Sequence, residues 1–298
     1  MTGAIASEPA NPEPYAIVAE WWRDRPSELV EVLRGANSLQ EAVAQSYLSF
    51  LQGDMDAAAM TIGSVTGVRP DIAWAAAPWF TDERFLGVVS ADALAEAAMR
   101  TMDRGHDLDA PDMRERFRPW FDAINAVRSR QPSPDALAKM AIFLRACGLT
   151  DASFALCDQA DSVERVMFTE VVRAGTWRKL GIPEQTAAAF ERAVTLDPTN
   201  WSLYLDLADL HAEQGDFAAA VQLTDRGLEH EPSEPTLRAA RAAYRTRLTG
   251  SPADLRELID LAPLLQNDSY RHVLIDHACA GDALPDELVA AARRIQAG

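Results

Sequence analysis

The first stretch whose residue types could do chemistry is a short acidic run with one histidine. It offers five candidate ligands, namely Asp103, His106, Asp107, Asp109 and Asp112. Carboxylate oxygens combined with one imidazole suit a divalent cation. The run lacks the spacing of a calcium-binding loop, and acids at a turn commonly cap the helix that follows. We favour the capping interpretation, with metal binding as the alternative.

Two histidines near the C-terminal end form the second candidate. His272 and Asp276 are four residues apart, so on a helix they share a face, and the carboxylate could orient the imidazole as a general base. His277 follows directly. The chain has no nucleophile elbow near these residues, no phosphate-binding glycine-rich loop, no His-Glu-x-x-His motif and no dinucleotide fingerprint. We therefore predict no catalytic residue, no bound metal and no cofactor. A metal-dependent enzyme or accessory factor is the alternative.

The clearest structural pattern lies in residues 201–234, which read as two amphipathic helices joined by a tight turn. Leu203 and Leu207 recur at helical spacing in the first helix. Gly215 supplies the permissive backbone that a helix end requires. Pro232 ends the second helix, because proline restricts the residue before it. Small residues recur where two helix axes would approach closely, as Ala208 and Ala220 do.

This hairpin resembles a tetratricopeptide repeat, because its large, small, glycine and proline positions fall at the offsets of that family. Four further frames repeat the pattern in part: residues 39–71, 134–166, 167–200 and 235–266. Each frame has a glycine at or near the turn, and these are Gly53, Gly148, Gly181 and Gly250. The resemblance implies an all-α fold, a right-handed α-solenoid of stacked helical hairpins.

The frames also suggest how the chain is divided. We expect a disordered, proline-rich leader in residues 1–13, degenerate hairpins in residues 14–132, a repeat array in residues 133–268 and capping helices in residues 269–298. Within the degenerate region, residues 112–128 read as one overlong helix. No segment shows convincing strand alternation.

Seven aromatic residues gather in the middle of the chain: Trp74, Trp79, Phe80, Phe85, Phe117, Trp120 and Phe121. Aromatic side chains at helical spacing usually pack adjacent helices together, so we favour a core. A ligand pocket lined by rings is the alternative.

Composition limits the function. The 298 residues are 48% hydrophobic, enough for a core, and carry a formal net charge of −17. Such a charge disfavours nucleic-acid binding, which depends on phosphate contacts, and it disfavours anionic lipid surfaces. No apolar run is long enough to span a bilayer, and no secretory signal is visible. The three cysteines form no metal or disulfide pattern. We expect a cytoplasmic location.

In tetratricopeptide repeats, fixed positions of each first helix face a concave groove, and the resemblance carries these positions onto this chain. The positions chosen as the partner-binding groove are Lys139, Ile142, Arg145, Phe168, Val171, Val172, Arg178, Lys179, Leu205, Asp206, Asp209 and Glu213. Both lysines of the chain are among them. We predict that the basic side chains and the apolar floor bind an acidic and apolar segment of a partner protein, while the acidic positions set its direction.

The sequence thus favours a non-catalytic adaptor or scaffold for protein–protein interaction. A small-peptide sensor whose helices tighten around a ligand is a further alternative, besides the metal-dependent enzyme.

Overall fold

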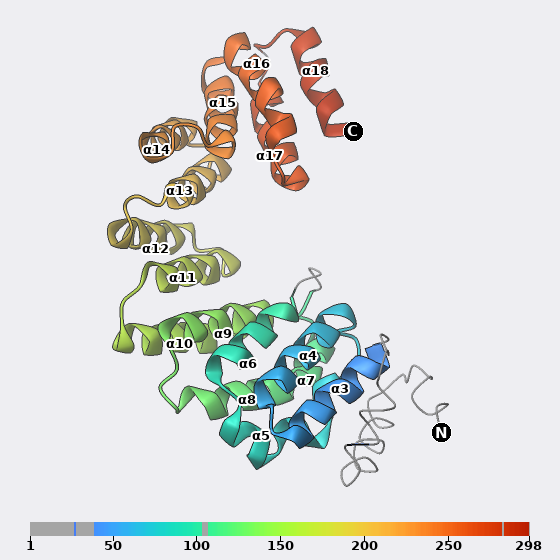
Figure 1. The fold of residues 1–298 in the computed structure, drawn as a ribbon. Helices are drawn as coiled ribbons and strands as arrows, with labels where there is room; N and C mark the ends of the chain where they lie inside the picture. Colours follow the sequence, from blue (N-terminus) through green and yellow to red (C-terminus); the bar gives the residue numbers. More distant parts are fainter. Residues whose placement is uncertain (1–26, 28–38, 103–106, 282, 298) are drawn as a thin grey trace. The chain divides into compact units, whose positions relative to one another are not determined.

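A computed structural model describes residue 27 and residues 39–102, 107–281 and 283–297. These residues form α-helices and short 3-10 helices, with no strand among them (Figure 1). The predicted fold class, an all-α solenoid of packed helical hairpins, is confirmed. The predicted leader, residues 1–13, lies outside the described residues.

The chain packs as two compact units, Met1–Thr176 and Trp177–Gly298. We call them the N-terminal unit and the C-terminal unit. The division falls inside helix α11 (Met167–Lys179). The predicted boundaries at residues 132 and 268 separate hairpins by repeat type and remain predictions.

The N-terminal unit contains helix pairs linked by short connections. Its helices are α3 (Leu39–Gln52), α4 (Met55–Val68), α5 (Glu83–Val88), α6 (Ala91–Arg100), α7 (Pro111–Arg116), α8 (Arg118–Arg128), α9 (Pro134–Ala146), α10 (Thr150–Val163) and most of α11, with 3-10 turns η2 (Trp74–Ala76) and η3 (Pro78–Thr81). Helix α4 packs on α6, α6 packs on α9, and α9 forms a hairpin with α10.

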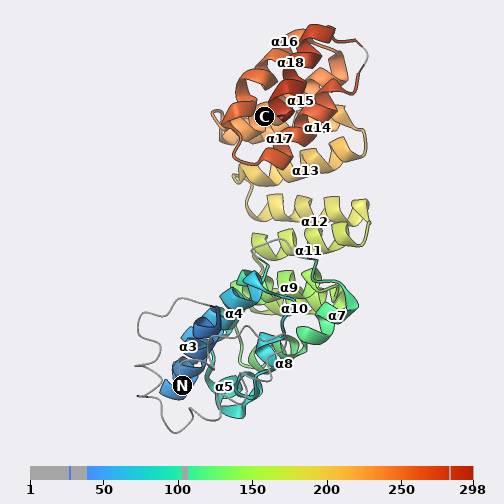
Figure 2. The same cartoon turned by 90° about the vertical axis from the view of Figure 1, so that its right-hand side faces the viewer.

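The C-terminal unit continues the hairpin series. Its helices are α12 (Pro183–Leu196), α13 (Trp201–Glu213), α14 (Phe217–His230), α15 (Pro235–Thr249), α16 (Pro252–Leu261), α17 (Asp268–Cys279) and α18 (Asp286–Ala297), with the 3-10 turn η4 (Ala262–Leu264). Helices α15, α16, α17 and α18 pack against one another (Figures 1 and 2). The two helices predicted to end the chain are therefore present as α17 and α18.

The α3–α4 hairpin forms as the repeat pattern predicts. Ser46 and Ala58, the two small positions of this frame, are both fully buried, and the Ser46 hydroxyl donates to the Ala58 carbonyl at 2.7 Å. Gly53 ends α3 with a φ of +86°, in the left-handed region that favours glycine. Asp54 then caps α4, because its side chain accepts from the Ala57 amide at 3.0 Å.

Helices α4 and α6 approach too closely for a side chain at their crossing. A Cβ atom at Gly63 would lie 2.8 Å from Cα of Ala97. Glycine at this position therefore permits a backbone contact between the two helices that alanine would obstruct.

The aromatic residues between α4 and α9 form a core. Six of the seven are buried, and the rings of Phe80 and Trp120 lie 4.9 Å apart between centroids. Trp79 meets Phe85 edge to face at 5.5 Å. Phe121 is partly buried and packs against the same core. These contacts bear out the packing interpretation.

The overlong helix expected over residues 112–128 is broken in two. Helix α7 ends at Arg116 and α8 begins at Arg118, with Phe117 between them. Pro119 explains the break, because proline lacks an N–H and its ring would clash with the carbonyl four residues earlier in a continuous helix. The break turns Phe117 into the core, where it is 1% exposed.

The turns of the C-terminal unit follow the repeat pattern. Gly181 and Gly215 adopt φ values of +70° and +82° at the ends of the first helices of their hairpins. Asp216 then caps α14 by accepting from the Ala219 amide at 3.0 Å. Local residue types are therefore sufficient to end one helix and begin the next.

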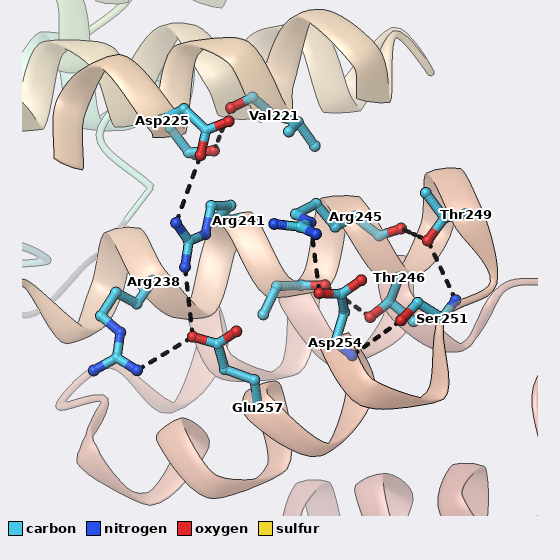
Figure 3. Close-up of polar contacts among 12 residues, drawn as sticks. Val221, Asp225, Arg238, Arg241, Arg245, Thr246, Thr249, Ser251, Asp254 and Glu257 are labelled. Atoms are coloured by element: carbon cyan, nitrogen blue, oxygen red, sulfur yellow. Dashed lines mark hydrogen bonds and ion pairs between the residues drawn. The ribbon is translucent and has the colours of Figure 1, made fainter. Parts of the chain in front are cut away.

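A row of arginines on α15 connects the helices on either side (Figure 3). Arg241 lies 3.6 Å from the Asp225 carboxylate of α14 and 3.6 Å from the Glu257 carboxylate of α16. The neighbouring pairs are Arg238 with Glu257 at 3.2 Å and Arg245 with Asp254 at 3.5 Å. Because α15 has opposite charges on both sides, these ion pairs fix its position between α14 and α16.

Candidate partner-binding site

Two acids of the candidate metal site are engaged by arginines, and a third, Asp107, accepts from the Asp109 amide at 3.0 Å. Asp109 forms an ion pair with Arg114, and Asp112 lies 3.0 Å from Arg116. Asp103 and His106 fall outside the described residues. Within the described ranges, no group of three or more His, Cys, Asp or Glu side chains is arranged to hold a metal ion.

Two members of the second candidate, Asp276 and His277 of α17, have structural partners. Asp276 accepts from the Gln296 amide at 3.0 Å and pairs with Arg293 of α18, and these contacts lower its pKa despite some desolvation. The His277 ring contacts Phe217, with 5.6 Å between centroids, and partial burial lowers the pKa of His277. The Asp276 carboxylate thus joins α17 to α18 rather than orienting His272.

Each predicted groove residue of the N-terminal unit lies on α9 or α11. Ile142 and Phe168 are half-buried against the aromatic core, Val171 is half-buried, and Val172 is buried. Lys139 is already paired, at 3.0 Å from Asp135 and 3.5 Å from Glu96. The hydrogen bond to Asp135 is the main reason why the pKa of Lys139 is raised.

Arg145 differs from Lys139, because no carboxylate of the described chain pairs with it. Its only hydrogen bond within the described residues runs from Nη1 to the Val172 carbonyl at 3.2 Å. Burial lowers the pKa of Arg145, since desolvation disfavours the charged form. The guanidinium is therefore partly removed from water without a compensating negative charge.

The position of Arg145 depends on Gly175 of α11. A Cβ atom at residue 175 would lie 2.9 Å from Cζ of Arg145, so any side chain there would displace the guanidinium. Phe168, Val172 and Gly175 recur at helical spacing, which places them on one face of α11. The side chain of Arg145 thus crosses from α9 to that face.

In the C-terminal unit, one of the two predicted basic side chains is paired with an acid of the same unit. Arg178 pairs with Glu213, and this hydrogen bond is the main cause of its raised pKa. Lys179 is exposed. Leu205 is partly buried against the core of this unit. Two of the four predicted basic positions, Lys139 and Arg178, are therefore neutralised by neighbours from their own unit.

Asp209 joins the first helices of three successive hairpins. Its Oδ1 atom accepts from the Tyr244 hydroxyl of α15 at 2.5 Å and from the Tyr270 hydroxyl of α17 at 2.8 Å. Burial still outweighs these bonds, so the pKa of Asp209 is raised. Half-buried Asp206, one turn earlier, has a pKa of about 6, because of desolvation and the nearby Asp209 charge.

The repeat frame assigns no role to Tyr244 or Tyr270. Both are polar aromatic residues on first helices, and a buried tyrosine hydroxyl normally needs a partner. Two such tyrosines indicate that a polar acceptor lies nearby, and the acids of α13 are candidates. This signal could not have identified Asp209 as the shared acceptor, because 35 and 61 residues separate it from the two tyrosines.

The stacked hairpins define a helical repeat protein. Residues 179–244 match the sequence model of the tetratricopeptide repeat family. This part of the chain thus contains tetratricopeptide repeats, and repeats of this family serve in general as scaffolds for interactions between proteins. None of the helices in the described ranges is both long and apolar enough to cross a membrane.

Two solved structures show how far the similarity extends. PilF from Pseudomonas aeruginosa is 17% identical, with a TM-score of 0.48, over 70% of this chain and 92% of PilF. A tetratricopeptide repeat protein from Parabacteroides merdae is 12% identical, with a TM-score of 0.47, over 94% of this chain and 98% of its own. Among curated protein sequences, none matches this chain significantly.

Proposed function

We propose that this protein is a non-catalytic adaptor that binds a segment of a partner protein along the inner faces of its first helices. In the N-terminal unit the binding face consists of α9 and α11, around Ile142, Arg145, Phe168 and Val171. We call this surface the α9–α11 face. The observation that supports it most is a charged guanidinium without an acidic partner in the described chain, next to half-buried apolar side chains.

Such a face suits a partner that brings both apolar and polar groups. Half-buried apolar side chains gain stabilisation when a partner removes their remaining surface from water, by about 25 cal/mol per Å². An adjacent unpaired charge adds orientation, because it excludes segments that cannot neutralise it. The proposal includes a cytoplasmic location and a protein partner rather than a nucleic acid, since a net charge of −17 repels phosphate.

Selection from a library of short random peptides tests this function without a known partner. The full chain should enrich peptides that share spaced apolar residues. Val171→Asp should abolish that enrichment, because it places a charge on the apolar part of the face. Val88→Asp is the matched control, since Val88 is 61% exposed on α5 and is not part of the face. If the full chain enriches no peptide family, or if Val171→Asp enriches the same family, the adaptor proposal is wrong.

A further inference from the structure

The four predicted basic groove residues differ in how much of their charge is available to a partner. Lys139 lies within 3.5 Å of two carboxylates, and Arg178 pairs with Glu213. Such pairs leave little net positive potential for an incoming acid. Arg145 has no ion pair within the described residues. Within the α9–α11 face, an acid that approaches the chain would therefore interact with Arg145 in preference to Lys139.

The donor geometry of Arg145 suits a carboxylate. Its guanidinium carries five N–H groups, and the bond to the Val172 carbonyl uses only one of them, on Nη1. The Nε and Nη2 groups remain, and together they form a planar edge that matches the two oxygens of a carboxylate. Neither atom is among the polar atoms of the described residues that are sealed from solvent without a partner. The Arg145 side chain is only partly buried, so this edge is where we expect a ligand to approach.

Gly175 prepares this geometry before any ligand arrives. Because residue 175 has no Cβ, the guanidinium lies against the α11 main chain, where a methyl group would come within 2.9 Å of Cζ. A side chain held in one place loses less entropy on binding than one that is free in solution. Apolar Ile142 and Phe168 lie one turn from Arg145 and Val172 along their helices, so a neighbouring apolar side chain has a place to pack.

We propose that Arg145 is the acid-recognition residue of the α9–α11 face: its Nε and Nη2 groups bind the carboxylate of an Asp or Glu side chain in a partner segment, whose neighbouring apolar side chain packs on Ile142 and Phe168. The inference rests on the proposed adaptor function and specifies the chemistry of its ligand. The net charge of −17 does not oppose it at short range, because distant acids are screened beyond about 8 Å at physiological ionic strength.

The test compares peptide selections by four versions of the full chain: wild type, Arg145→Gln, Arg145→Lys and Arg118→Gln. Wild type should enrich peptides with Asp or Glu at a fixed position relative to an apolar residue. Arg145→Gln should keep the apolar preference and lose the acidic one. Arg145→Lys should weaken the acidic preference, because a lysine ammonium cannot form the two parallel bonds. Arg118 is an exposed arginine of α8, and its replacement should change nothing.

A synthetic version of the best peptide then gives the magnitude by calorimetry. Replacing its acidic residue with the corresponding amide should weaken binding to wild type about tenfold, as expected for a charge-assisted pair. The same replacement should change binding to Arg145→Gln less than about twofold. The loss of affinity that this replacement causes with wild type should be smaller at high salt. Circular dichroism of each variant confirms that the helices are intact.

The outcomes separate the two proposals. If wild type selects apolar peptides without a fixed acid, or if Arg145→Gln keeps the acidic preference, the role of Arg145 is wrong while the adaptor function stands. If wild type enriches nothing, the adaptor function fails and the role of Arg145 fails with it. Gly175→Ala provides a second variant that retains the charge but displaces the guanidinium, and an undiminished acidic preference in that variant would also contradict the proposed geometry.

Discussion

Tyr270 donates its hydroxyl to Asp209 across 61 residues, at 2.8 Å, and shares that acceptor oxygen with Tyr244. Hydrogen bonds to a charged group are worth about 1.5–3 kcal/mol, more than bonds between neutral groups. The acceptor is largely buried, so each donor offsets part of its desolvation. This relationship holds α13, α15 and α17 together at one atom.

We expect Tyr270→Phe to destabilise the C-terminal unit by about 1–3 kcal/mol, since Asp209 would keep only one donor. Hydrogen exchange of the α13 and α17 amides measures the loss. Tyr204→Phe is the matched control, because its hydroxyl donates to a neutral acceptor, the Pro198 carbonyl, at 2.8 Å. A larger loss for the control than for Tyr270→Phe would show that the shared carboxylate is not a major constraint.

The second prediction concerns pH and Asp206. Its pKa of about 6 in the folded chain exceeds the ordinary value of 3.8, so the folded state binds the proton more tightly than the unfolded state does. Linkage then requires that this group lower the free energy of unfolding as the pH rises from about 4 to 6. Asp206→Asn should therefore be more stable than wild type at about pH 7, by on the order of 2 kcal/mol.

The advantage of Asp206→Asn should shrink as the pH falls from about 6 to about 4 and vanish below the ordinary value of 3.8, where the wild-type carboxyl is protonated in both states. Melting curves of both proteins over this range measure the difference. Comparing the two proteins removes the contribution of carboxyl groups that do not interact with Asp206, such as Asp276, whose pKa is lowered and whose effect on stability has the opposite sign. A difference that does not vary with pH would contradict the assignment.

The third prediction uses Arg145 and Gly175 together. In the wild-type background, Gly175→Ala should destabilise the N-terminal unit by up to about 1 kcal/mol, because the methyl group displaces the guanidinium, the far end of a flexible side chain. In an Arg145→Ala background the same change should stabilise it by up to about 1 kcal/mol, since alanine is the better helix former. Urea unfolding of the four proteins measures this coupling, and equal effects in both backgrounds would refute the contact.

The fourth prediction concerns the crossing of α4 and α6. Gly63→Ala should destabilise the N-terminal unit by roughly 1–3 kcal/mol despite the higher helix propensity of alanine, because the new Cβ would lie 2.8 Å from Cα of Ala97. Gly87→Ala in α5 is the control, since no atom lies within 4 Å of a Cβ there. In thermal unfolding, Gly63→Ala should melt below wild type and Gly87→Ala should melt at or above it.

Much of the fold was predictable because its signals are local. The turn glycines, such as Gly181 and Gly215, and the capping side chain of Asp216 end and begin helices through groups a few residues away. The single helix predicted over residues 112–128 was wrong, because the ring and missing N–H of Pro119 interrupt the helix despite the apolar pattern. Proline sets helix boundaries as strongly as glycine does.

The candidate site was less predictable, because its electrostatics depend on stacking. The positions of Lys139 and Arg178 follow from the repeat frame, and the nearer partner of Lys139, Asp135, is only four residues away. The other acidic partners, Glu96 for Lys139 and Glu213 for Arg178, lie 43 and 35 residues away. Which charge remains unpaired is decided only when neighbouring helices come together. Arg145 could be placed on the inner face from sequence, whereas its lack of an acidic partner in the described chain could not.

Asp209 also affects how the C-terminal unit can be altered. In an ideal repeat array each repeat contacts only its neighbours, so one repeat can be deleted and the flanking repeats joined directly. Here a single carboxylate on α13 is bonded to the next hairpin and to the one after it. Removing residues 182–215 would leave two buried tyrosine hydroxyls without their acceptor. This end of the chain should consequently melt as a block instead of fraying helix by helix.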